Sequence, residues 1–475
     1  MTEHEIVAEV ERKFRRALES RCTVRAGDVV GVATSGGPDS VALLLLFHRF
    51  KEELAVELAV LHFDHALRKS SGRDREFVEK LADRLGLEFI WKREDVASLA
   101  KTRRLSVEEA ARRARYAWFK ELLDAGRVSR VATGHNMDDQ AETVLYRIVR
   151  GTGPDGLSSI EPIGMDGKII RPLLDVRKRD LERYVRARGY SFVIDETNLS
   201  DSFVRNRIRR DLIPALEEIN PRVVESLARL ASVAFDLKSW LRRKSDDLLS
   251  SCIEAQEEGA ILLNRQKLLA LDPFERVCAV RRALERVVGD PFGYEYRDYT
   301  RIVSLIGSSD SFSWDAGRGV RIEMSSGLIR IGPPAEPPVQ DVCEIPNVGE
   351  YECPGLGIRV SVRRRPITSA REAMNYSGYS ALLDADRIDF PLYIRFPKEG
   401  DRFFPLGAPG EKKLADFFVD AKIPRFVRKK VPLLVSGGEI AWVIGHRISH
   451  IFRITPKTKA ALEITVDLQS SADES

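Results

Sequence analysis

Residues 35–40, with the sequence SGGPDS, combine the residue types that bind a phosphate group. Glycine lets backbone N–H groups close on an oxyanion, because no Cβ atom stands in the way. Ser35 and Ser40 offer hydroxyl groups to phosphate oxygens. Asp39 repels phosphate but is a suitable ligand for Mg²⁺. The segment is therefore predicted to bind ATP through six residues: Ser35, Gly36, Gly37, Pro38, Asp39 and Ser40.

This segment differs from the P-loop that cradles a transferable γ-phosphate. The pattern G-x-x-x-x-G-K-[ST], with its lysine, does not occur here. An ordinary strand-to-helix turn rich in small residues is the alternative interpretation. The complete motif lies between an apolar strand and an apolar helix, whose N-terminus favours anions. We therefore favour phosphate binding.

Two carboxylates, Asp139 and Glu142, lie three residues apart and share one face of a predicted helix. Such a pair suits a cationic substrate or a second Mg²⁺ contact. Helix capping is the alternative, because Asp138 and Asp139 would stabilise any first helical turn. A helix cap does not need the additional carboxylate of Glu142, which favours a functional role for the pair. His135 precedes this helix and is predicted either to contact phosphate or a base, or to be structural.

Histidine and cysteine spacing argues against a transition-metal site. His62 and His65 resemble a metal-binding pair, but no third or fourth ligand lies near them in the sequence. The five cysteines are scattered and contain no C-x-x-C pair. We therefore expect neither a zinc site nor a disulfide framework.

The elements that must position these residues alternate between strand and helix. Strands are predicted at 29–34, 58–63, 87–91 and 129–134, and helices at 41–50, 73–85, 106–124 and 138–149. This alternation predicts an α/β fold with a parallel sheet covered on both faces. Three motifs fall at strand ends, where such sheets bind ligands. They are residues 35–37, 62–65 and 134–135.

The rest of the chain divides by composition. Punctuation at Pro214 and Asn220-Pro221 marks a first boundary, and the segment 333–338 (PPAEPP) is a linker by composition. The predicted parts are a parallel-sheet, Rossmann-like catalytic domain at 1–220, a mainly helical middle domain at 221–332, a linker with short strands at 333–385, a small α+β C-terminal domain at 386–468 and a disordered tail at 469–475.

Charge and hydropathy limit the partners. The net charge is only +4, but residues 395–430 hold ten Lys/Arg and five Asp/Glu, and residues 205–210 hold four arginines. Such clusters are phosphate-contact candidates or solvated faces, and both readings stay open. The longest apolar run, Val41–Phe47, is too short to span a membrane. The charged N-terminus does not match a signal peptide, so a cytoplasmic location is expected.

The 35–40 segment resembles the PP-loop of N-type ATP pyrophosphatases, which split ATP between the α- and β-phosphates. The ordered set of further motifs resembles the tRNA(Ile)-lysidine synthase family. These motifs are residues 61–68 (LHFDHALR), 132–143 (ATGHNMDDQAET), 150–153 (RGTG), 171–174 (RPLL), 195–198 (DETN), 205–209 (RNRIR), 400–403 (GDRF), 412–418 (KKLADFF), 423–425 (IPR) and 442–447 (WVIGHR). Family members often carry Val or Asn where this chain has Phe63 and Asp64, which affects adenine packing only.

The resemblance implies a reaction and its partners. The wobble cytidine of an isoleucine tRNA with a CAU anticodon is adenylated at O2 with ATP and Mg²⁺, and lysine then displaces AMP to form lysidine, changing codon reading from AUG to AUA. A homodimer is one option for the assembly.

The resemblance also implies roles for residues. Asp39, Arg115, His135, Asp139 and Glu142 would be catalytic, with Asp139 and Glu142 binding lysine. His62 would line the adenine pocket, and Arg115 would stabilise charge at the α-phosphate. The residues implied to bind tRNA are Arg205, Arg207, Lys412, Lys413, Arg425, Arg428, Lys429 and Lys430.

Three other functions are weighed against this one. A PP-loop tRNA thiolase, making 2-thiocytidine, generally needs paired cysteines, which this chain lacks. A small-molecule amide ligase would need an ammonia source but no basic C-terminal unit. A non-catalytic RNA-binding protein with a relic nucleotide fold does not need Asp39, Asp139 and Glu142 intact.

Overall fold

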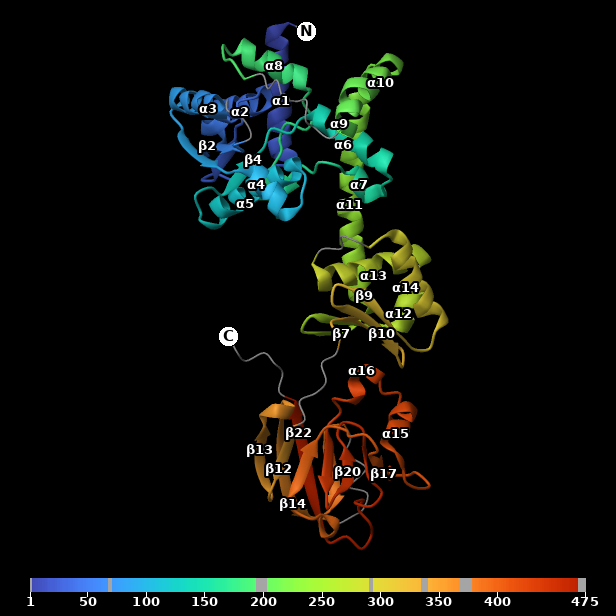
Figure 1. Ribbon diagram of the computed structural model, residues 1–475. Coiled ribbons are helices and arrows are strands. Elements are labelled where there is room, and N and C mark those ends of the chain that lie inside the picture. Colours follow the sequence, from blue (N-terminus) through green and yellow to red (C-terminus); the bar gives the residue numbers. More distant parts are fainter. Residues whose placement is uncertain are drawn as a thin grey trace. The chain divides into compact units, whose positions relative to one another are not determined.

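The N-terminal unit, residues 1–241, is built on a six-stranded sheet (Figure 1). The computed structural model describes residues 2–66, 71–193, 203–289, 294–334, 341–367 and 378–468. The strand order is β3-β2-β1-β4-β6-β5, and all neighbours are parallel except β5 and β6. The strands are β1 (Val29–Ala33), β2 (Glu57–Asp64), β3 (Glu88–Arg93), β4 (Arg130–Ala132), β5 (Ile163–Gly164) and β6 (Ile169–Ile170).

The sheet is buried on both faces, as the strand composition predicts. Leu58 and Val60 of β2 pack into one hydrophobic cluster, while Leu61 and Phe63 pack into another. This alternation follows from the two-residue period of a strand. The four strands and the four helices predicted for this region are confirmed.

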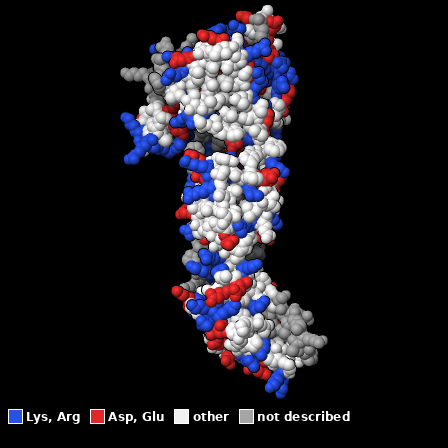
Figure 2. Space-filling view, turned by 90° about the vertical axis from the view of Figure 1, so that its right-hand side faces the viewer, with Lys and Arg blue, Asp and Glu red and all other residues white. Residues whose placement is uncertain are grey.

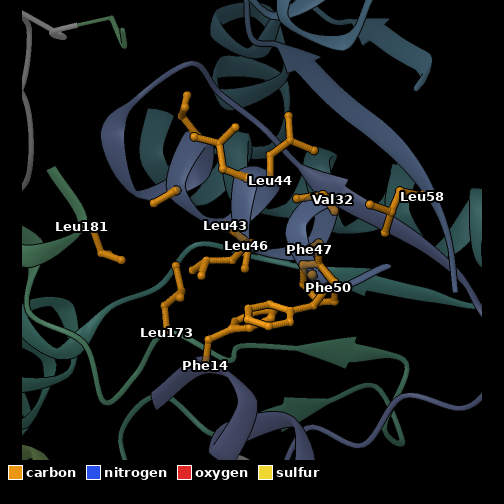
Figure 3. Close-up of a cluster of buried hydrophobic side chains, with 14 of the residues drawn as sticks. Phe14, Val32, Leu43, Leu44, Leu46, Phe47, Phe50, Leu58, Leu173 and Leu181 are labelled. Atoms are coloured by element: carbon orange, nitrogen blue, oxygen red, sulfur yellow. The ribbon is translucent and has the colours of Figure 1, made fainter. Parts of the chain in front are cut away.

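Helices cover the two faces. The first cluster joins α1, α2 and α8 to the sheet, and the aromatic rings of Phe14 and Phe47 meet there at 5.0 Å between centroids (Figure 3). The second cluster joins α4 and α5 to the other face. The helices of the unit before α9 are α1 (Glu3–Ser20), α2 (Pro38–Leu54), α3 (Ser71–Leu85), α4 (Val96–Arg103), α5 (Val107–Asp124), α6 (Met137–Arg150), α7 (Pro154–Leu157) and α8 (Lys178–Ala187).

A second helical layer supports α6. Met137, Ala141 and Leu145 of α6 pack against Ile208 and Val224. The partners belong to a run of helices that contains one π-helical turn, a feature that often marks functional sites. The run consists of α9 (Phe203–Arg207), the π-turn η1 (Ile208–Leu212), α10 (Ile213–Ile219) and, after a short break, α11 (Val223–Cys252).

Arg177 ties the start of α6 to this layer. Its guanidinium contacts three carboxylates, Asp138 at 3.1 Å, Glu217 at 3.0 Å and Glu225 at 3.1 Å, and its side chain is only 9% exposed. The backbone N–H of Lys178 also donates to Asp138 at 2.7 Å. Asp138 is therefore a structural anchor of α6.

We expect Arg177→Met to lower the free energy of unfolding by about 2–4 kcal/mol, because it leaves half-buried carboxylates without a counter-ion. Urea unfolding followed by circular dichroism measures this change. Arg179→Met is the matched control, since the Arg179 side chain is 65% exposed and pairs only loosely with Asp180. Equal midpoints for the two variants would contradict the role of Arg177.

The second unit, residues 242–475, begins with an antiparallel five-stranded sheet. The range 221–332, predicted to be a mainly helical domain, therefore contains a five-stranded sheet as well. The strand order is β7-β8-β11-β10-β9, with β7 (Ile253–Glu257), β8 (Ala260–Asn264), β9 (Phe312–Gly317), β10 (Val320–Ser325) and β11 (Leu328–Gly332). The helices are α12 (Arg265–Ala270), α13 (Pro273–Val288) and α14 (Tyr296–Ser308).

Two packed sheets form the C-terminal part. One has the order β12-β16-β19-β20-β21 and the other β13-β14-β22-β15, with one hydrophobic core between them. The elements are β12 (Val342–Ile345), β13 (Gly349–Cys353), β14 (Ile358–Pro366), β15 (Ser380–Asp384), β16 (Leu392–Arg395), β17 (Arg402–Phe403), β18 (Lys412–Lys413), α15 (Leu414–Asp420), α16 (Arg425–Arg428), β19 (Leu433–Ser436), β20 (Glu439–Val443), β21 (Arg447–Ile448) and β22 (Ala460–Leu468).

Strand pairing crosses the predicted limit between 385 and 386. β12 pairs with β16, and β14 and β15 both pair with β22. We therefore propose that the two ranges 333–385 and 386–468 form one body from β12 to β22. Similarly, the compact units divide at 241/242, inside α11, rather than at 220.

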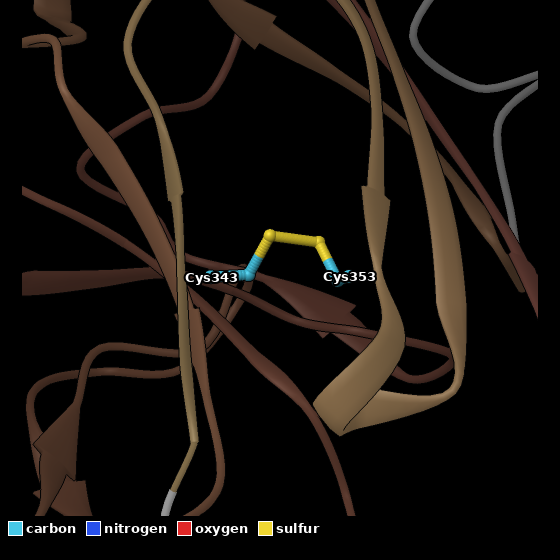
Figure 4. The surroundings of a disulfide bond; sticks show 2 residues. All are labelled: Cys343 and Cys353. Atoms are coloured by element: carbon cyan, nitrogen blue, oxygen red, sulfur yellow. A yellow bond between two sulfur atoms is a disulfide. The ribbon is translucent and has the colours of Figure 1, made fainter.

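The sequence analysis expected no disulfide framework, but one pair of cysteines is bonded. Cys343 in β12 and Cys353 in β13 are bonded, with their Cα atoms 5.6 Å apart (Figure 4). The two strands belong to different sheets that pack together, so their pairing follows from tertiary structure rather than from C-x-x-C spacing. Cys22, Cys252 and Cys278 are buried and are not disulfide-bonded.

Some sequence predictions lie outside the described residues. These are Leu67 and Arg68 of the second motif, the motif 195–198, part of the 333–338 linker and the tail 469–475. Among the helices that are described, none combines the length and the apolar character that a membrane crossing requires.

Candidate functional site

A cavity of about 350 Å³ opens at the carboxyl ends of the parallel strands. This is where the sheet topology predicts a ligand site, and its size falls within the range of small-molecule sites. Several predicted site residues line it together, although they come from four separate segments: Ser35, Gly37, Asp39, Ser40, His62, Arg115, His135 and Asp139.

The loop between β1 and α2 is shaped by its own serine hydroxyls. The Ser40 hydroxyl donates to the Gly37 carbonyl at 3.0 Å and accepts from the Ser35 backbone N–H at 3.1 Å. Gly36 has φ +95°, which disfavours any side chain. Gly37 caps α2 with no side-chain hydrogen bond, and Pro38 follows. The first N–H groups of α2 are therefore not covered by a capping side chain, as anion binding requires.

The end of β4 approaches this loop closely. A Cβ atom at Gly134 would lie 3.2 Å from backbone atoms of Asp39 and Ser40. A side chain at this position would therefore push the two motifs apart. This contact explains how residues a hundred positions apart come to share one cavity.

Asp39 lacks a hydrogen-bonding partner for one of its carboxylate oxygens. Its Oδ1 is buried and unpaired among the described residues. Burial, and secondarily the nearby carboxylate of Asp139, raise the pKa of Asp39 to about 7. A buried carboxylate of this kind is stabilised by a cation, so the site fits Mg²⁺.

The three histidines at the strand ends are held neutral by burial. The pKa of His62 is lowered, that of His65 falls to about 4 and that of His135 to about 3. The arginines Arg171 and Arg115 lower the pKa of His135 further. The Nδ1–H of His62 donates to the Thr34 carbonyl at 2.9 Å. Neutral rings are suited to hydrogen bonding with a base or sugar rather than to charge pairing with phosphate.

Asp139 and Glu142 lie on one face of α6, as predicted, but have different surroundings. Asp139 Oδ2 accepts from the Asn136 N–H at 3.0 Å, so Asp139 does take part in a capping box. It also lines the cavity. Glu142 is 7% exposed and lies outside the cavity lining. Burial raises the pKa of both carboxyl groups.

Arg209 occupies the carboxylate of Glu142. Its Nε donates to Glu142 Oε1 at 2.6 Å and its Nη2 donates to Oε2 at 2.8 Å. The same Nη2 lies 3.9 Å from Asp139 Oδ1. The sequence analysis selected Arg205 and Arg207 from this segment and missed Arg209.

Arg205 and Arg207 have unlike environments. Arg205 pairs with Glu108 of α5, and its guanidinium lies 5.5 Å from the ring centroid of Tyr146. Arg207 is exposed and lies 3.9 Å from Asp211. Arg205 is thus held against α5 and α6, two helices that contribute residues to the cavity.

The C-terminal basic residues sit around α15 and α16 in the second unit. Arg425, Lys413, Lys429 and Lys430 are exposed. Lys412 pairs with Asp420 at 2.5 Å, and the Arg428 guanidinium donates to the Ile423 carbonyl at 2.9 Å. On the face shown in Figure 2, basic and acidic side chains are interspersed, so charge of one sign does not cover it.

Comparisons with known proteins give matches in both the N-terminal and the C-terminal part of the chain. Residues 7–216 match the PP-loop domain family, and residues 392–464 match the TilS substrate C-terminal domain. The tRNA(Ile)-lysidine synthase of Geobacter sulfurreducens is 34% identical, covering 96% of this chain and 97% of that protein. That of Symbiobacterium thermophilum is 37% identical, covering 93% and 94% respectively.

Proposed function

The chain belongs to the tRNA(Ile)-lysidine synthase family, and from this premise we propose how its residues carry out the reaction. ATP would activate O2 of the wobble cytidine of a CAU-anticodon isoleucine tRNA. Cytidine O2 attacks the α-phosphate, and pyrophosphate leaves. The ε-amine of lysine then attacks C2, and AMP leaves with the former O2. The observation that carries this proposal is the cavity where the PP-loop, Asp39 and Asp139 meet.

The N-terminus of α2 and the serine-lined loop would bind the phosphates of ATP. Ser35, Ser40 and the uncovered N–H groups supply donors. His62, neutral and buried against β1, is suited to line an adenine pocket. Arg115 reaches the same cavity from α5, and we assign it to the charge that develops at the α-phosphate.

Mg²⁺ would be held by Asp39, together with phosphate oxygens and water. Magnesium sites of this kind use one or two protein carboxylates rather than a full protein cage. Among the described residues no cluster of three or more His, Cys, Asp or Glu side chains offers such a cage. When bound, the ion neutralises charge on the phosphates. Asp139 also lines the cavity, and we assign this second carboxylate either to Mg²⁺ or to the lysine substrate.

His135 would contact the cytidine. Its ring is neutral, and its Nδ1 lies 3.0 Å from the Thr133 hydroxyl, which fixes the ring's orientation. Both properties support a hydrogen bond to the base. The face of α6 with Asp139 and Glu142 would bind the lysine.

One experiment tests the proposed reaction. The protein is incubated with labelled lysine, ATP and total bacterial tRNA, and the tRNA nucleosides are then analysed. We expect label in a single modified cytidine, with one AMP formed per lysine incorporated. A thiolated cytidine, or no modified nucleoside, would contradict the proposal.

The C-terminal basic residues are proposed to bind the tRNA backbone. Replacing Arg428, Lys429 and Lys430 together with Gln should weaken tRNA binding at least about tenfold near 0.1 M salt. It should also reduce the slope of log affinity against log salt by roughly 0.7–0.9 for each lost phosphate contact. ATP binding should not change. Binding is measured at several salt concentrations.

Lys457→Gln with Lys459→Gln provides the control for this triple variant. Both lysines are exposed in the same C-terminal body, but lie outside the predicted cluster. We expect this pair to leave the salt slope nearly unchanged. Identical slopes for the wild type and the triple variant would mean that the cluster is a solvated face.

A further inference from the structure

Asn136 is a buried polar residue at the point where the end of β4 passes into α6. Only 1% of its surface is exposed. It lies two residues after Gly134, where a Cβ atom would come within 3.2 Å of backbone atoms of Asp39 and Ser40. The segment that carries Asn136 is therefore packed against the PP-loop. A side chain as polar and as buried as this needs hydrogen-bonding partners.

The oxygen of the Asn136 side chain is occupied by α6. Its Oδ1 accepts from the backbone N–H groups of Asp138 at 2.9 Å and of Asp139 at 3.0 Å. These two donors identify the oxygen end of the side chain, because an NH₂ group cannot accept from them. The amide nitrogen takes no part in this cap and remains available to donate elsewhere.

Asp39 is the acceptor on the other side of Asn136. Burial and the carboxylate of Asp139 raise the pKa of Asp39, whereas Lys178 and a hydrogen bond from the Asn136 side chain oppose the rise. Such a bond stabilises the charged form of a carboxylate. Asp39 Oδ1 has no hydrogen-bonding partner among the described residues, so the amide contact belongs to the other oxygen. The protein thus holds one oxygen of Asp39 and leaves the other for a cation.

Asn136 serves the second carboxylate of the cavity as well. Its backbone N–H donates to Asp139 Oδ2 at 3.0 Å. Asp39 and Asp139 are therefore both tied to one residue, one through its side chain and the other through its backbone. Two like charges repel each other, so a carboxylate without such a tie would turn away from its neighbour. A cap alone needs only the oxygen of Asn136, and the amide nitrogen provides the additional contact.

We propose that Asn136 is a positioning residue: by donating to Asp39 and Asp139, it orients the Asp39 carboxylate toward Mg²⁺ and fixes its place beside Asp139. The inference rests on the proposed binding of Mg²⁺ by Asp39. Asn136 does not line the cavity, so it acts through the two carboxylates rather than on the substrates.

A Mg²⁺ titration of the full-length protein tests this role. The probe is an ATP analogue with a methylene group between its α- and β-phosphates, which binds but cannot lose pyrophosphate. Binding is measured by calorimetry at about pH 8.5, where the Asp39 carboxyl, with a pKa of about 7, is ionised. Asn136→Ser should raise the Mg²⁺ concentration for half-maximal binding by roughly 10- to 100-fold, the usual cost of losing a residue that orients a metal ligand.

Two substitutions of Asn136 separate positioning from capping. Asn136→Ser removes the amide donor but keeps a capping oxygen, because serine caps helices about as well as asparagine. Asn136→Ala removes both. The two variants should need more Mg²⁺ by the same factor. Only Asn136→Ala should loosen the first turn of α6, seen as roughly fivefold faster amide hydrogen exchange at Asp138 and Asp139.

Asn264 offers a matched control in the second unit, none of whose described residues lines the cavity. Its Oδ1 caps α12 by accepting from the Lys267 N–H at 3.1 Å, and its Nδ2 donates to Glu254 at 3.1 Å. Asn264→Ser therefore makes the same change, in which a cap is kept and a carboxylate loses its donor. It should leave the Mg²⁺ requirement within about twofold of the wild type.

A double variant tests whether Asn136 acts through Asp39. In Asp39→Asn the charged ligand is already absent, so there is no carboxylate for Asn136 to orient. Adding Asn136→Ser to Asp39→Asn should therefore change analogue binding by less than about twofold.

Four results would overturn the inference. They are a wild-type Mg²⁺ requirement in Asn136→Ser, a change in Asn136→Ala alone, as a pure cap would give, a change of equal size in Asn264→Ser, and a full further loss in the double variant. If the wild type binds the analogue independently of Mg²⁺, the proposed metal role of Asp39 fails instead. That outcome is distinguishable because it does not depend on any variant.

Discussion

Asp39→Asn should reduce AMP formation by at least about 1,000-fold while the protein stays folded. The substitution preserves the size of the side chain but removes its charge, and a charged ligand is worth several kcal/mol of stabilisation at a phosphate-bound Mg²⁺. The wild-type carboxylate already has one buried oxygen without a hydrogen bond. AMP release in the presence of tRNA and lysine measures the activity, and circular dichroism the fold.

The raised pKa of Asp39 adds a pH dependence. Since this pKa is about 7 in the ligand-free protein, Mg²⁺ must displace a proton below that pH. The apparent affinity of the protein for Mg²⁺, measured through Mg²⁺-dependent ATP binding, should therefore rise by roughly tenfold per pH unit up to pH 7. Above pH 7 it should level off. Asp39→Asn should abolish this dependence.

A neighbouring carboxylate provides the control. Asp74 also lines the cavity but carries no proposed role, so Asp74→Asn should cost far less activity. Near-wild-type AMP formation by folded Asp39→Asn would rule out the metal role. A loss of equal size in Asp74→Asn would indicate a general electrostatic effect of the cavity.

Sequence analysis predicted best the site residues that lie at the ends of parallel strands. Ser35 and His135 follow β1 and β4, and His62 lies near the end of β2. Parallel strands place their carboxyl ends at one edge of a sheet. Short-range rules were thus enough to bring them into one cavity. The same rules predicted the helices, because capping and 3.6-residue periodicity are local properties.

Long-range contacts were not predictable in this way. The Arg177 cluster joins Asp138 to Glu225, which are 87 positions apart, and the Cys343–Cys353 bond depends on how two sheets pack. β7 is mostly exposed, and Ile253 is its one β-branched residue, so its sequence carries little strand signal.

Arg209 could have been found from its spacing. Arg205 and Arg209 are four residues apart and therefore share a helix face, whereas Arg207 lies on another. In the structure Arg205 pairs with Glu108 and Arg209 with Glu142, while Arg207 is exposed. Selecting the arginine that shares a helix face with Arg205 would therefore have identified Arg209 in place of Arg207.

Asp139→Asn and Glu142→Gln should each lower kcat/KM for lysine by about 100-fold, while tRNA affinity changes less than about threefold. Each removes one negative charge from the face of α6 proposed to bind lysine, and a buried charge-assisted contact is worth about 1.5–3 kcal/mol. Lysine-dependent transfer is measured separately from tRNA binding. A collapse of tRNA binding with an unchanged lysine requirement would contradict the assignment.

The amide variants also separate binding from capping at Asp139. A capping box needs an oxygen that accepts the Asn136 N–H, and the asparagine side chain still provides one. A purely capping role would therefore leave lysine use nearly intact in Asp139→Asn. Asp138→Asn supplies the complementary case, because Asp138 anchors α6 to Arg177 and does not line the cavity. Asp138→Asn should lower stability more than it lowers lysine use. Asp139→Asn should do the opposite, so the two variants distinguish a charge that binds lysine from a residue that supports the helix.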